Sequence, residues 1–126
     1  MLVIARNRIL QVIAVLILIV GIGYLAGSVH IKQQMQKREV VNVTNSEDQK
    51  ILFYRDDCPD CRKVFPSLFI KNFLEQELIF VNLNQPENRK YIQQYQLKEV
   101  PTVINGKNSY SGIDMGKIEH ILKNSR

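Results

Sequence analysis

Cysteine is scarce in this chain: two of its 126 residues are cysteines, Cys58 and Cys61. Two cysteines are too few for a framework of disulfide bonds, so the chain needs an apolar core of its own. Charged residues of one sign do not cluster along the sequence either. The formal net charge is +5, but acidic and basic residues are interspersed, and basic residues do not alternate with aromatic ones. This pattern is typical of a solvated surface and excludes a nucleic-acid-binding stripe.

Charged residues are absent from a long stretch near the N-terminus, from Ile9 to Gly27. Its side chains are apolar on every side of a helix, and a run of about 20 such residues matches the hydrocarbon core of a bilayer. Arg6 and Arg8 precede the run, as in the basic region of a signal or anchor. The run exceeds the apolar core of a cleaved signal peptide, about 7–15 residues, which predicts an uncleaved anchor. A signal peptide cleaved near Ala26-Gly27-Ser28 is the alternative.

Two features disagree on the orientation of this anchor. The short N-terminal tail is typical of a signal-anchor, which places the C-terminal part outside the cell. Basic residues concentrate on the cytoplasmic side, and here Arg6 and Arg8 precede the run while Lys32, Lys37 and Arg38 follow it. We follow the signal-anchor pattern and predict a single-pass cell-membrane protein with an extracytoplasmic C-terminal domain.

The sequence predicts four parts. Residues 1–8 form a basic tail, 9–27 the transmembrane anchor, 28–48 a polar linker whose first part can extend the membrane helix, and 49–126 a domain. In the domain, strand and helix patterns alternate in the order β-α-β-α-β-β-α. The predicted elements are strands at Ile51–Tyr54, Leu78–Leu83, Thr102–Ile104 and near Ser109–Ser111, and helices at Pro59–Phe73, after Pro86 and after Asp114. Alternation predicts a parallel strand pair, and Asn105-Gly106 predicts a hairpin, so we expect an α/β domain with a mixed four-stranded sheet.

The two cysteines form the motif Cys58-Pro59-Asp60-Cys61 between the first predicted strand and helix. At a helix N-terminus, unpaired backbone N–H groups and the helix dipole stabilise a thiolate, here at Cys58. Cys61 lies about one turn further, on the apolar face that Val64 and Phe65 share, close enough to attack a mixed disulfide at Cys58. The motif therefore predicts thiol–disulfide exchange, with Cys58 and Cys61 as catalytic residues and no metal or organic cofactor.

Around this motif, Lys50 to Lys123 resembles the thioredoxin-like superfamily. The order of elements is that family's minimal fold, Arg62 follows the second cysteine, Pro66 interrupts the helix, and Val100-Pro101-Thr102 resembles the family's cis-proline loop. The resemblance implies that Pro101 is cis and stands beside the cysteines. It also implies that Val100, Pro101 and Thr102 bind an extended substrate peptide, and that the chain is a thiol–disulfide oxidoreductase.

The sequence departs from the family's pattern at three places. Asp57 stands where typical thioredoxins have an aromatic residue, and Pro59-Asp60 replaces the common Gly-Pro between the cysteines. Leu52 occupies the position of a buried acid that assists proton transfer at the second cysteine. A Cys-Pro-x-Cys order also occurs in glutaredoxin-like and oxidant-type members. Basic and acidic residues near Cys58 have opposing effects on its thiolate, so the direction of electron transfer stays open.

Two functions follow as hypotheses. The first is a membrane-anchored oxidoreductase that exchanges disulfides with extracytoplasmic proteins or peptides and with an unidentified membrane redox partner, similar to small membrane-tethered thioredoxin-like proteins of Gram-positive bacteria. The alternative is an accessory or binding subunit of a bacteriocin-type peptide export system, with little redox activity. Three other interpretations of these residues are open: a zinc site in which His30 and His120 complete the cysteine pair, an inert Cys58–Cys61 disulfide, and a trans peptide bond before Pro101.

Overall fold

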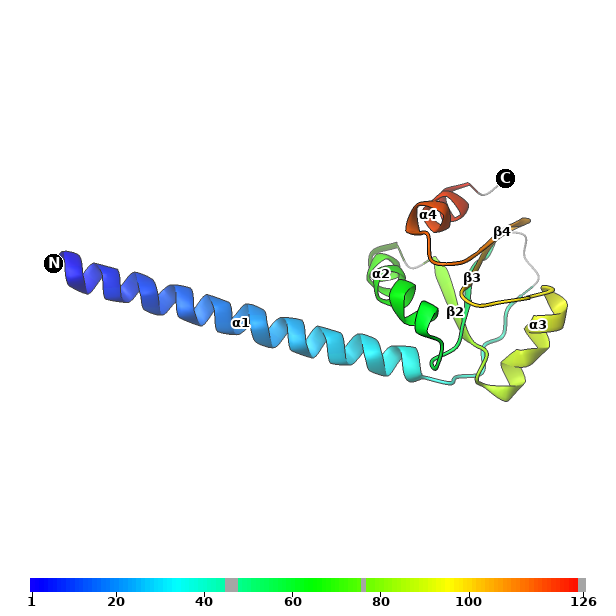
Figure 1. Ribbon diagram of the computed structural model, residues 1–126, viewed down its shortest axis with the longest axis horizontal. Helices are drawn as coiled ribbons and strands as arrows, with labels where there is room; N and C mark the ends of the chain where they lie inside the picture. The colour runs from blue at the N-terminus through cyan, green and yellow to red at the C-terminus, as the bar shows by residue number, and fades with distance from the viewer. Residues whose placement is uncertain (45–47, 76, 125–126) are drawn as a thin grey trace. The chain divides into compact units, whose positions relative to one another are not determined.

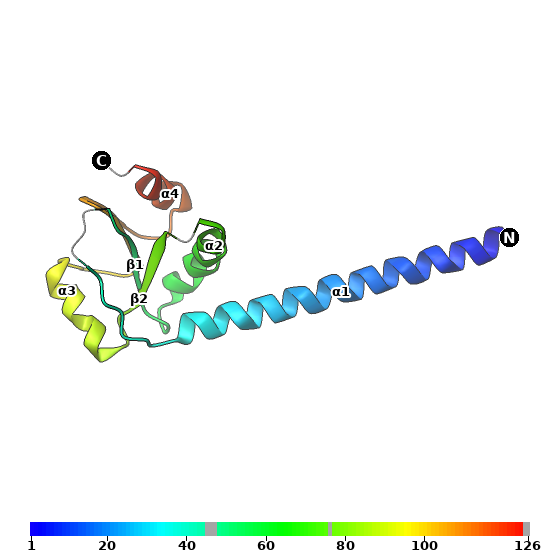
Figure 2. The same cartoon turned by 180° about the vertical axis from the view of Figure 1, so that it is seen from behind.

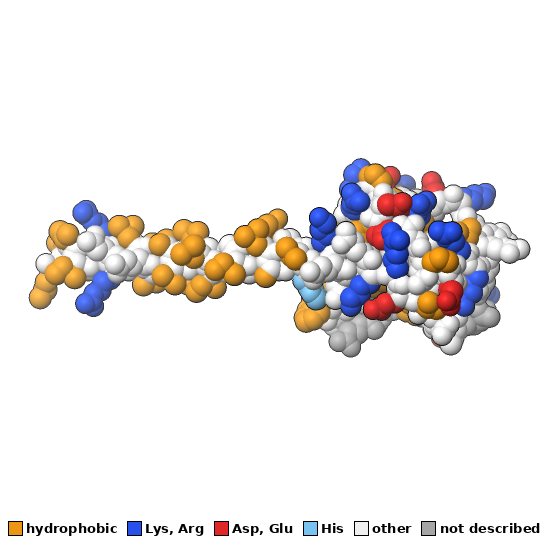
Figure 3. Space-filling model, turned by 90° about the horizontal axis from the view of Figure 1, so that it is seen from below, with side chains coloured by type: hydrophobic (Ala, Val, Ile, Leu, Met, Phe, Trp, Pro, Cys, Tyr) orange, Lys and Arg blue, Asp and Glu red, His pale blue; other side chains and the backbone are white. Residues whose placement is uncertain are grey.

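The computed structural model describes residues 1–44, 48–75 and 77–124, and it divides into two units, Met1–Gln34 and the chain from Met35 onward. Residues 45–47 of the predicted linker thus lie outside the described residues. The first unit is a single helix, α1, which runs from Leu2 to Gln36 (Figure 1). Apolar side chains are exposed along it (Figure 3). In the described part of the chain, α1 is the one helix long and apolar enough to cross a membrane, as the sequence predicts.

The second unit is built on a mixed four-stranded sheet with the strand order β2-β1-β3-β4. The strands are β1 (Lys50–Tyr54), β2 (Leu78–Asn82), β3 (Thr102–Asn105) and β4 (Asn108–Ser111). β1 pairs parallel to β2 and antiparallel to β3, and β3 and β4 form the hairpin predicted at Asn105-Gly106. Gly106 has a φ of +59°, a conformation that glycine adopts without steric cost. The predicted α/β fold, with the element order of the minimal thioredoxin-like fold, is confirmed.

Helices cover both faces of this sheet. α2 (Pro59–Glu75) and α4 (Met115–Lys123) lie on one face, and the short helices η1 (Pro86–Arg89) and α3 (Lys90–Gln94) lie on the other (Figures 1 and 2). β1 is buried on both sides because its alternate side chains enter different layers. Tyr54 contacts Phe65 of α2 with ring centroids 4.9 Å apart, and Phe53 lies 6.1 Å from Tyr91 of α3.

Pro66, Pro86 and Asp114 occupy the places in the helices that the sequence predicts. Pro86 opens η1, and Pro66 lies inside α2, as predicted. Asp114 caps α4, since its carboxylate accepts a hydrogen bond from the backbone N–H of Lys117 at 3.2 Å. Acidic and basic side chains are interspersed on the face of the domain seen in Figure 3, as expected for a solvated surface.

The segment that follows α1 packs on the domain. We call Lys37–Val43 the strap. Its Val41 and Val43 lie against the core cluster that contains Phe53 and Tyr91. This packing differs from the solvated spacer that the polar composition of residues 28–48 predicts. It brings the chain into the domain at the carboxyl ends of β1 and β2, where the Cys58 loop also begins.

Candidate functional site

The two cysteines lie at the first turn of α2, where the sequence places them. Cys58 precedes the helix and is half-buried, whereas Cys61 is fully buried, and both are free thiols. The backbone N–H of Cys61 donates a hydrogen bond to Cys58 Sγ at 3.2 Å, and the N–H of Arg62 donates to the Cys58 carbonyl at 3.2 Å. One of the unpaired N–H groups of the helix start is thus directed at the Cys58 sulfur, where it stabilises negative charge.

The two thiols have different environments. Burial raises the pKa of Cys61 to about 12, and a hydrogen bond with the Cys58 side chain contributes in the same direction. Leu52, at the position of the buried acid of typical thioredoxins, is fully buried and supplies Cys61 with no proton acceptor. Cys61 therefore stays a neutral thiol at physiological pH, and the more accessible Cys58 is the better nucleophile.

The predicted cis-proline loop lies beside the cysteines. The Val100–Pro101 peptide bond is cis, and Cys58 Sγ lies 3.7 Å from the Val100 carbonyl oxygen, to which the thiol donates. Pro101 is buried and Val100 half-buried. Thr102 is buried in β3, where its hydroxyl donates to the Glu99 carbonyl at 2.6 Å and shares a hydrogen bond with Ser111 at 2.7 Å. The structure thus brings the Val100 carbonyl to Cys58, while the Thr102 side chain is engaged inside the domain.

Three acidic residues near Cys58 each have a basic partner. Asp56 accepts two hydrogen bonds from Arg38 at 2.8 and 3.3 Å. Asp57 pairs with Arg55 at 3.0 Å, and Asp60, exposed next to Pro59 in the first turn of α2, pairs with Lys63 at 3.0 Å. Each partner offsets a negative charge that would oppose a thiolate at Cys58.

Asp56 and Asp57 also share the side-chain amide of Asn84, which donates to both carboxylates. Burial raises the pKa of Asp56, but the hydrogen bonds from Arg38 and Asn84 and the Arg38 charge outweigh it and hold that pKa below its usual range. The pKa of Asp57 is lowered as well, first by the hydrogen bond from Asn84. Both acids are therefore ionised at neutral pH.

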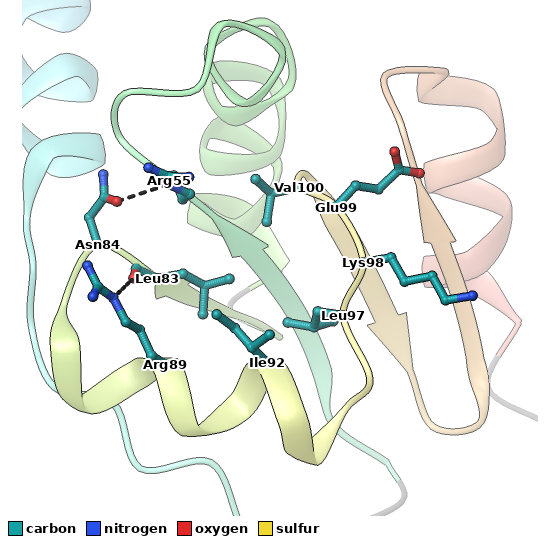
Figure 4. Close-up of a pocket in the computed structure, with 9 residues that line it drawn as sticks. All are labelled: Arg55, Leu83, Asn84, Arg89, Ile92, Leu97, Lys98, Glu99 and Val100. Carbon is teal, nitrogen blue, oxygen red and sulfur yellow. Dashed lines mark hydrogen bonds between the residues drawn. The ribbon is translucent and has the colours of Figure 1, made fainter.

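A pocket of about 300 Å³ opens next to Val100, between the ends of β1 and β2, α3 and the cis-proline loop (Figure 4). Leu83, Ile92 and Leu97 give it an apolar lining. Its charged lining residues are Arg55, Arg89, Lys98 and Glu99. Arg89 donates to the Leu83 carbonyl at 3.2 Å, and Arg55 donates to Asn84 at 3.0 Å. The pocket can take an apolar side chain, and its cations outnumber its single carboxylate.

Arg38, Asn84 and the residues that line the pocket, apart from Val100, are not singled out as functional by the sequence. A polar pair, Asn82 and Asn84, at the end of an apolar strand was an available signal, because buried asparagines need partners. Arg38 has no such signal, since it lies in a polar segment far from Cys58 in sequence.

The described residues contain no cluster of three His, Cys, Asp or Glu side chains that could hold a metal ion. The ring of His120, on α4, lies 3.0 Å from the side-chain amide of Asn124, which follows the helix. Within the described residues, the cysteine pair is thus not part of a cluster of three such side chains.

No protein-family model matches this chain, and no curated protein matches it. The functional argument accordingly comes from the fold and the geometry of the site.

Proposed function

We propose that this chain is a membrane-anchored thiol–disulfide oxidoreductase of the thioredoxin-like superfamily, in which Cys58 is the nucleophile and Cys61 the resolving cysteine. One observation carries the proposal: a half-buried thiol at a helix start accepts the Cys61 N–H at 3.2 Å, beside a buried second thiol. An inert structural cysteine pair needs neither the accessible sulfur nor the difference in environment.

The proposed reaction has two steps in the reducing direction. The Cys58 thiolate attacks a substrate disulfide, a bond forms between Cys58 and one substrate sulfur, and the other substrate sulfur leaves as a thiolate that takes up a proton. Cys61 then loses its proton and attacks Cys58 Sγ. This step forms the Cys58–Cys61 disulfide and releases the second substrate thiol. Two electrons pass from the dithiol to the substrate, and the reverse sequence installs a disulfide in the substrate.

The high pKa of Cys61 supports this order of events. A thiol whose pKa is about 12 does not compete with Cys58 for the first attack. Once Cys58 is in a mixed disulfide, its hydrogen bond with Cys61 is lost. That interaction contributes to the raised pKa, so its loss favours deprotonation of Cys61 at the moment the second attack requires it.

Substrate peptides are proposed to bind at Val100. Its carbonyl faces Cys58 Sγ at 3.7 Å, so an extended peptide along this backbone would bring its disulfide to the sulfur. The side chain next to the substrate cysteine would enter the pocket lined by Leu83 and Leu97. Arg89 and Lys98 at this pocket favour peptides that carry a carboxylate near the disulfide.

For the localisation, we propose a single-pass anchor in α1 with the domain outside the cytoplasm. The charge-free run from Ile9 to Gly27 is the part of α1 suited to the hydrocarbon core. An extracytoplasmic dithiol needs an electron donor or acceptor for each turnover, so a membrane redox partner is part of the proposal.

The reduction potential of the full chain in detergent tests this function. The chain is equilibrated in glutathione and dithiothreitol buffers, and the fraction of Cys58–Cys61 disulfide is read by mass spectrometry, with Cys61→Ser as the control that cannot close the disulfide. A value near about −270 mV indicates a reductant, and one near about −120 mV an oxidant that installs disulfides. If no reversible couple forms, the enzyme proposal fails and an accessory subunit that binds export substrates becomes the better explanation.

A further inference from the structure

The strap is fixed to the domain by side chains that reach its backbone. Asn82 donates to the Lys37 carbonyl at 3.0 Å, and Asn88 donates to the Glu39 carbonyl at 2.8 Å. The backbone N–H of Val41 donates to the Asn88 side-chain oxygen at 3.0 Å, and Tyr91 donates its hydroxyl hydrogen to the Val41 carbonyl at 2.7 Å. Asn82, Asn88 and Tyr91 are all buried. The strap is therefore held in one register along the ends of β2, η1 and α3.

This register places Arg38 against the loop that carries Cys58. Its guanidinium contacts both carboxylate oxygens of Asp56, two residues before the nucleophile. The Asp56 side chain is 8% exposed and the Arg38 side chain 57%. Water thus solvates the arginine, whereas the carboxylate depends on Arg38 and Asn84 for its stabilisation.

The Arg55–Cys58 loop also forms one hydrogen bond with α2 and one within its own backbone. Arg62 donates to the Asp56 carbonyl at 3.3 Å, and the backbone N–H of Cys58 donates to the Arg55 carbonyl at 3.3 Å. The backbone from Arg55 to Cys58, which carries the Asp56 side chain, is therefore held both by α2 and by a hydrogen bond of its own.

We propose that Arg38 is a positioning residue of the redox site: through Asp56 it holds the Arg55–Cys58 loop and offsets the charge of a carboxylate two residues before Cys58. The strap is then part of the site and connects the end of the membrane anchor to the nucleophile. This inference rests on the proposed function, because it assigns Arg38 a role in the reactivity of Cys58.

The charged and titratable groups around Asp56 come from several elements. Arg38 lies on the strap, and Arg62 approaches from α2. Arg55 and Asp57 flank Asp56 in sequence, and Tyr54 lies one residue before Arg55. Asp57 already has Arg55 as its partner, and Arg62 contacts the Asp56 backbone rather than its carboxylate. Burial raises the pKa of Tyr54, and the Asp56 charge raises it further, so Tyr54 stays neutral and does not replace Arg38.

The test uses the full chain in detergent with Cys61→Ser, so that alkylation reports Cys58 alone. The rate of Cys58 modification by iodoacetamide is measured from pH 5 to pH 10 for the parent, Arg38→Gln and Lys37→Gln. Lys37→Gln is the matched control, because it removes the same charge from the neighbouring residue, whose side chain pairs with exposed Glu39 at 3.8 Å. Loss of Arg38 is expected to reduce the rate at pH 7 about three- to tenfold and to move the midpoint of the profile upward, because the Asp56 carboxylate then keeps the Asn84 hydrogen bond but loses its cationic partner. Lys37→Gln is expected to leave the profile unchanged.

A second set of variants separates charge from folding. Asp56→Asn removes the carboxylate, so Arg38→Gln in that background is expected to have little further effect on the profile. Arg38→Lys keeps the charge and is expected to lie between the parent and Arg38→Gln. The inference is overturned if the alkylation profiles of Arg38→Gln and the parent coincide. It is also overturned if Lys37→Gln shifts the profile as much as Arg38→Gln does. If Arg38→Gln does not fold, equal profiles for Arg38→Lys and the parent overturn it.

The outcome is independent of whether the cysteines exchange with a substrate. If the chain with both cysteines forms no reversible Cys58–Cys61 couple, the proposed function is refuted, even if Arg38 controls Cys58 alkylation in the Cys61→Ser background. A reversible couple combined with unchanged Arg38 profiles refutes this inference alone.

Discussion

The backbone N–H of Cys61 points at the Sγ of Cys58, 3.2 Å away, where it stabilises negative charge on that sulfur. The donor comes from the first turn of α2, so formation of the helix and stabilisation of a thiolate at Cys58 depend on the same backbone. The second thiol is buried behind it. The two sulfurs are thus close in sequence but unequal in access to solvent.

From this inequality, the two cysteines are expected to give different phenotypes when replaced. Cys58→Ser should abolish reaction with a disulfide peptide, since the buried Cys61 thiol does not replace the nucleophile. Cys61→Ser should react once and then stop as a mixed disulfide, because no second thiol resolves it. Mass spectrometry of the chain after incubation with the peptide distinguishes the two. A stable adduct on Cys61 in the Cys58→Ser chain would contradict the assigned roles.

The pKa of Cys61 predicts how stability depends on alkaline pH. In the unfolded chain the thiol titrates near 9, whereas in the folded chain its pKa is about 12. Between these values the folded state binds more protons than the unfolded state, so the free energy of unfolding falls as pH rises through this window. Below about pH 9 the contribution of the buried neutral thiol is fully present.

Denaturant unfolding of the reduced chain at pH 8 and pH 10.5 measures this effect. Cys61→Ala lowers stability at both pH values because it removes buried volume, but its loss between the two should be smaller than that of the parent. Groups that do not contact Cys61 are the same in both chains, so their contributions cancel in the comparison. Equal losses in the two chains would show that Cys61 is not held as a neutral thiol.

The elements of the domain could be predicted because their signals are local. The apolar run Ile51–Tyr54 and the helical apolar period of Cys61, Val64 and Phe65 each fix one element, and Asn105-Gly106 and Asp114 mark a turn and a cap. The cysteine motif and Val100-Pro101 were likewise visible, since motif residues keep fixed places in a fold.

The strap could not be predicted in the same way, because its contacts join residues about 50 positions apart and are made by side chains to backbone. Asn88 and Tyr91 donate hydrogen bonds to backbone carbonyls of the strap. The strap sequence shows no periodic pattern that would indicate these contacts, apart from the alternation of Val41 and Val43, which pack on the core. The Arg38–Asp56 pair is likewise long-range, and polar residues in a polar segment carry no signal of their partners. The sequence therefore predicts the redox pair but not the groups that surround it.

The strap contacts predict a large stability effect at Asn88. Its amide donates to the Glu39 and Asn82 carbonyls and accepts from Val41, all in a fully buried position. Asn88→Ala leaves these backbone groups without partners and is expected to lower the free energy of unfolding by about 1–3 kcal/mol. Asn42→Ala, the same substitution at an exposed strap position, is the matched control and should change stability by less than about 0.5 kcal/mol. Similar effects of both substitutions in denaturant unfolding would show that the strap does not contribute to the folded domain.

The pocket beside Val100 predicts a preference among substrates. Two disulfide peptides that differ by one acidic or neutral residue next to the cysteine are compared at low salt. Arg89→Gln and Lys98→Gln should slow the acidic peptide about two- to fivefold and leave the neutral one unaffected, since exposed charge pairs are worth at most about 1 kcal/mol. The difference should disappear at 1 M salt. Lys123→Gln on α4, outside the pocket, is the control. Equal slowing of both peptides would mean that these residues do not select substrate charge.

Labelling of Cys58 can decide the orientation of the anchor, because the chain has one accessible cysteine and one buried one. If the domain faces outward, a membrane-impermeant maleimide should label Cys58 in intact cells after mild reduction, and lysis should add little signal. A chain with Cys58→Ser and Cys61→Ser that carries Ser67→Cys on exposed α2 is the control for access, since its thiol lies outside the redox pair. Labelling of both chains only after lysis would place the domain in the cytoplasm. In that case the balance of Arg6 and Arg8 against Lys32, Lys37 and Arg38, rather than the short tail, would be the signal that sets the topology.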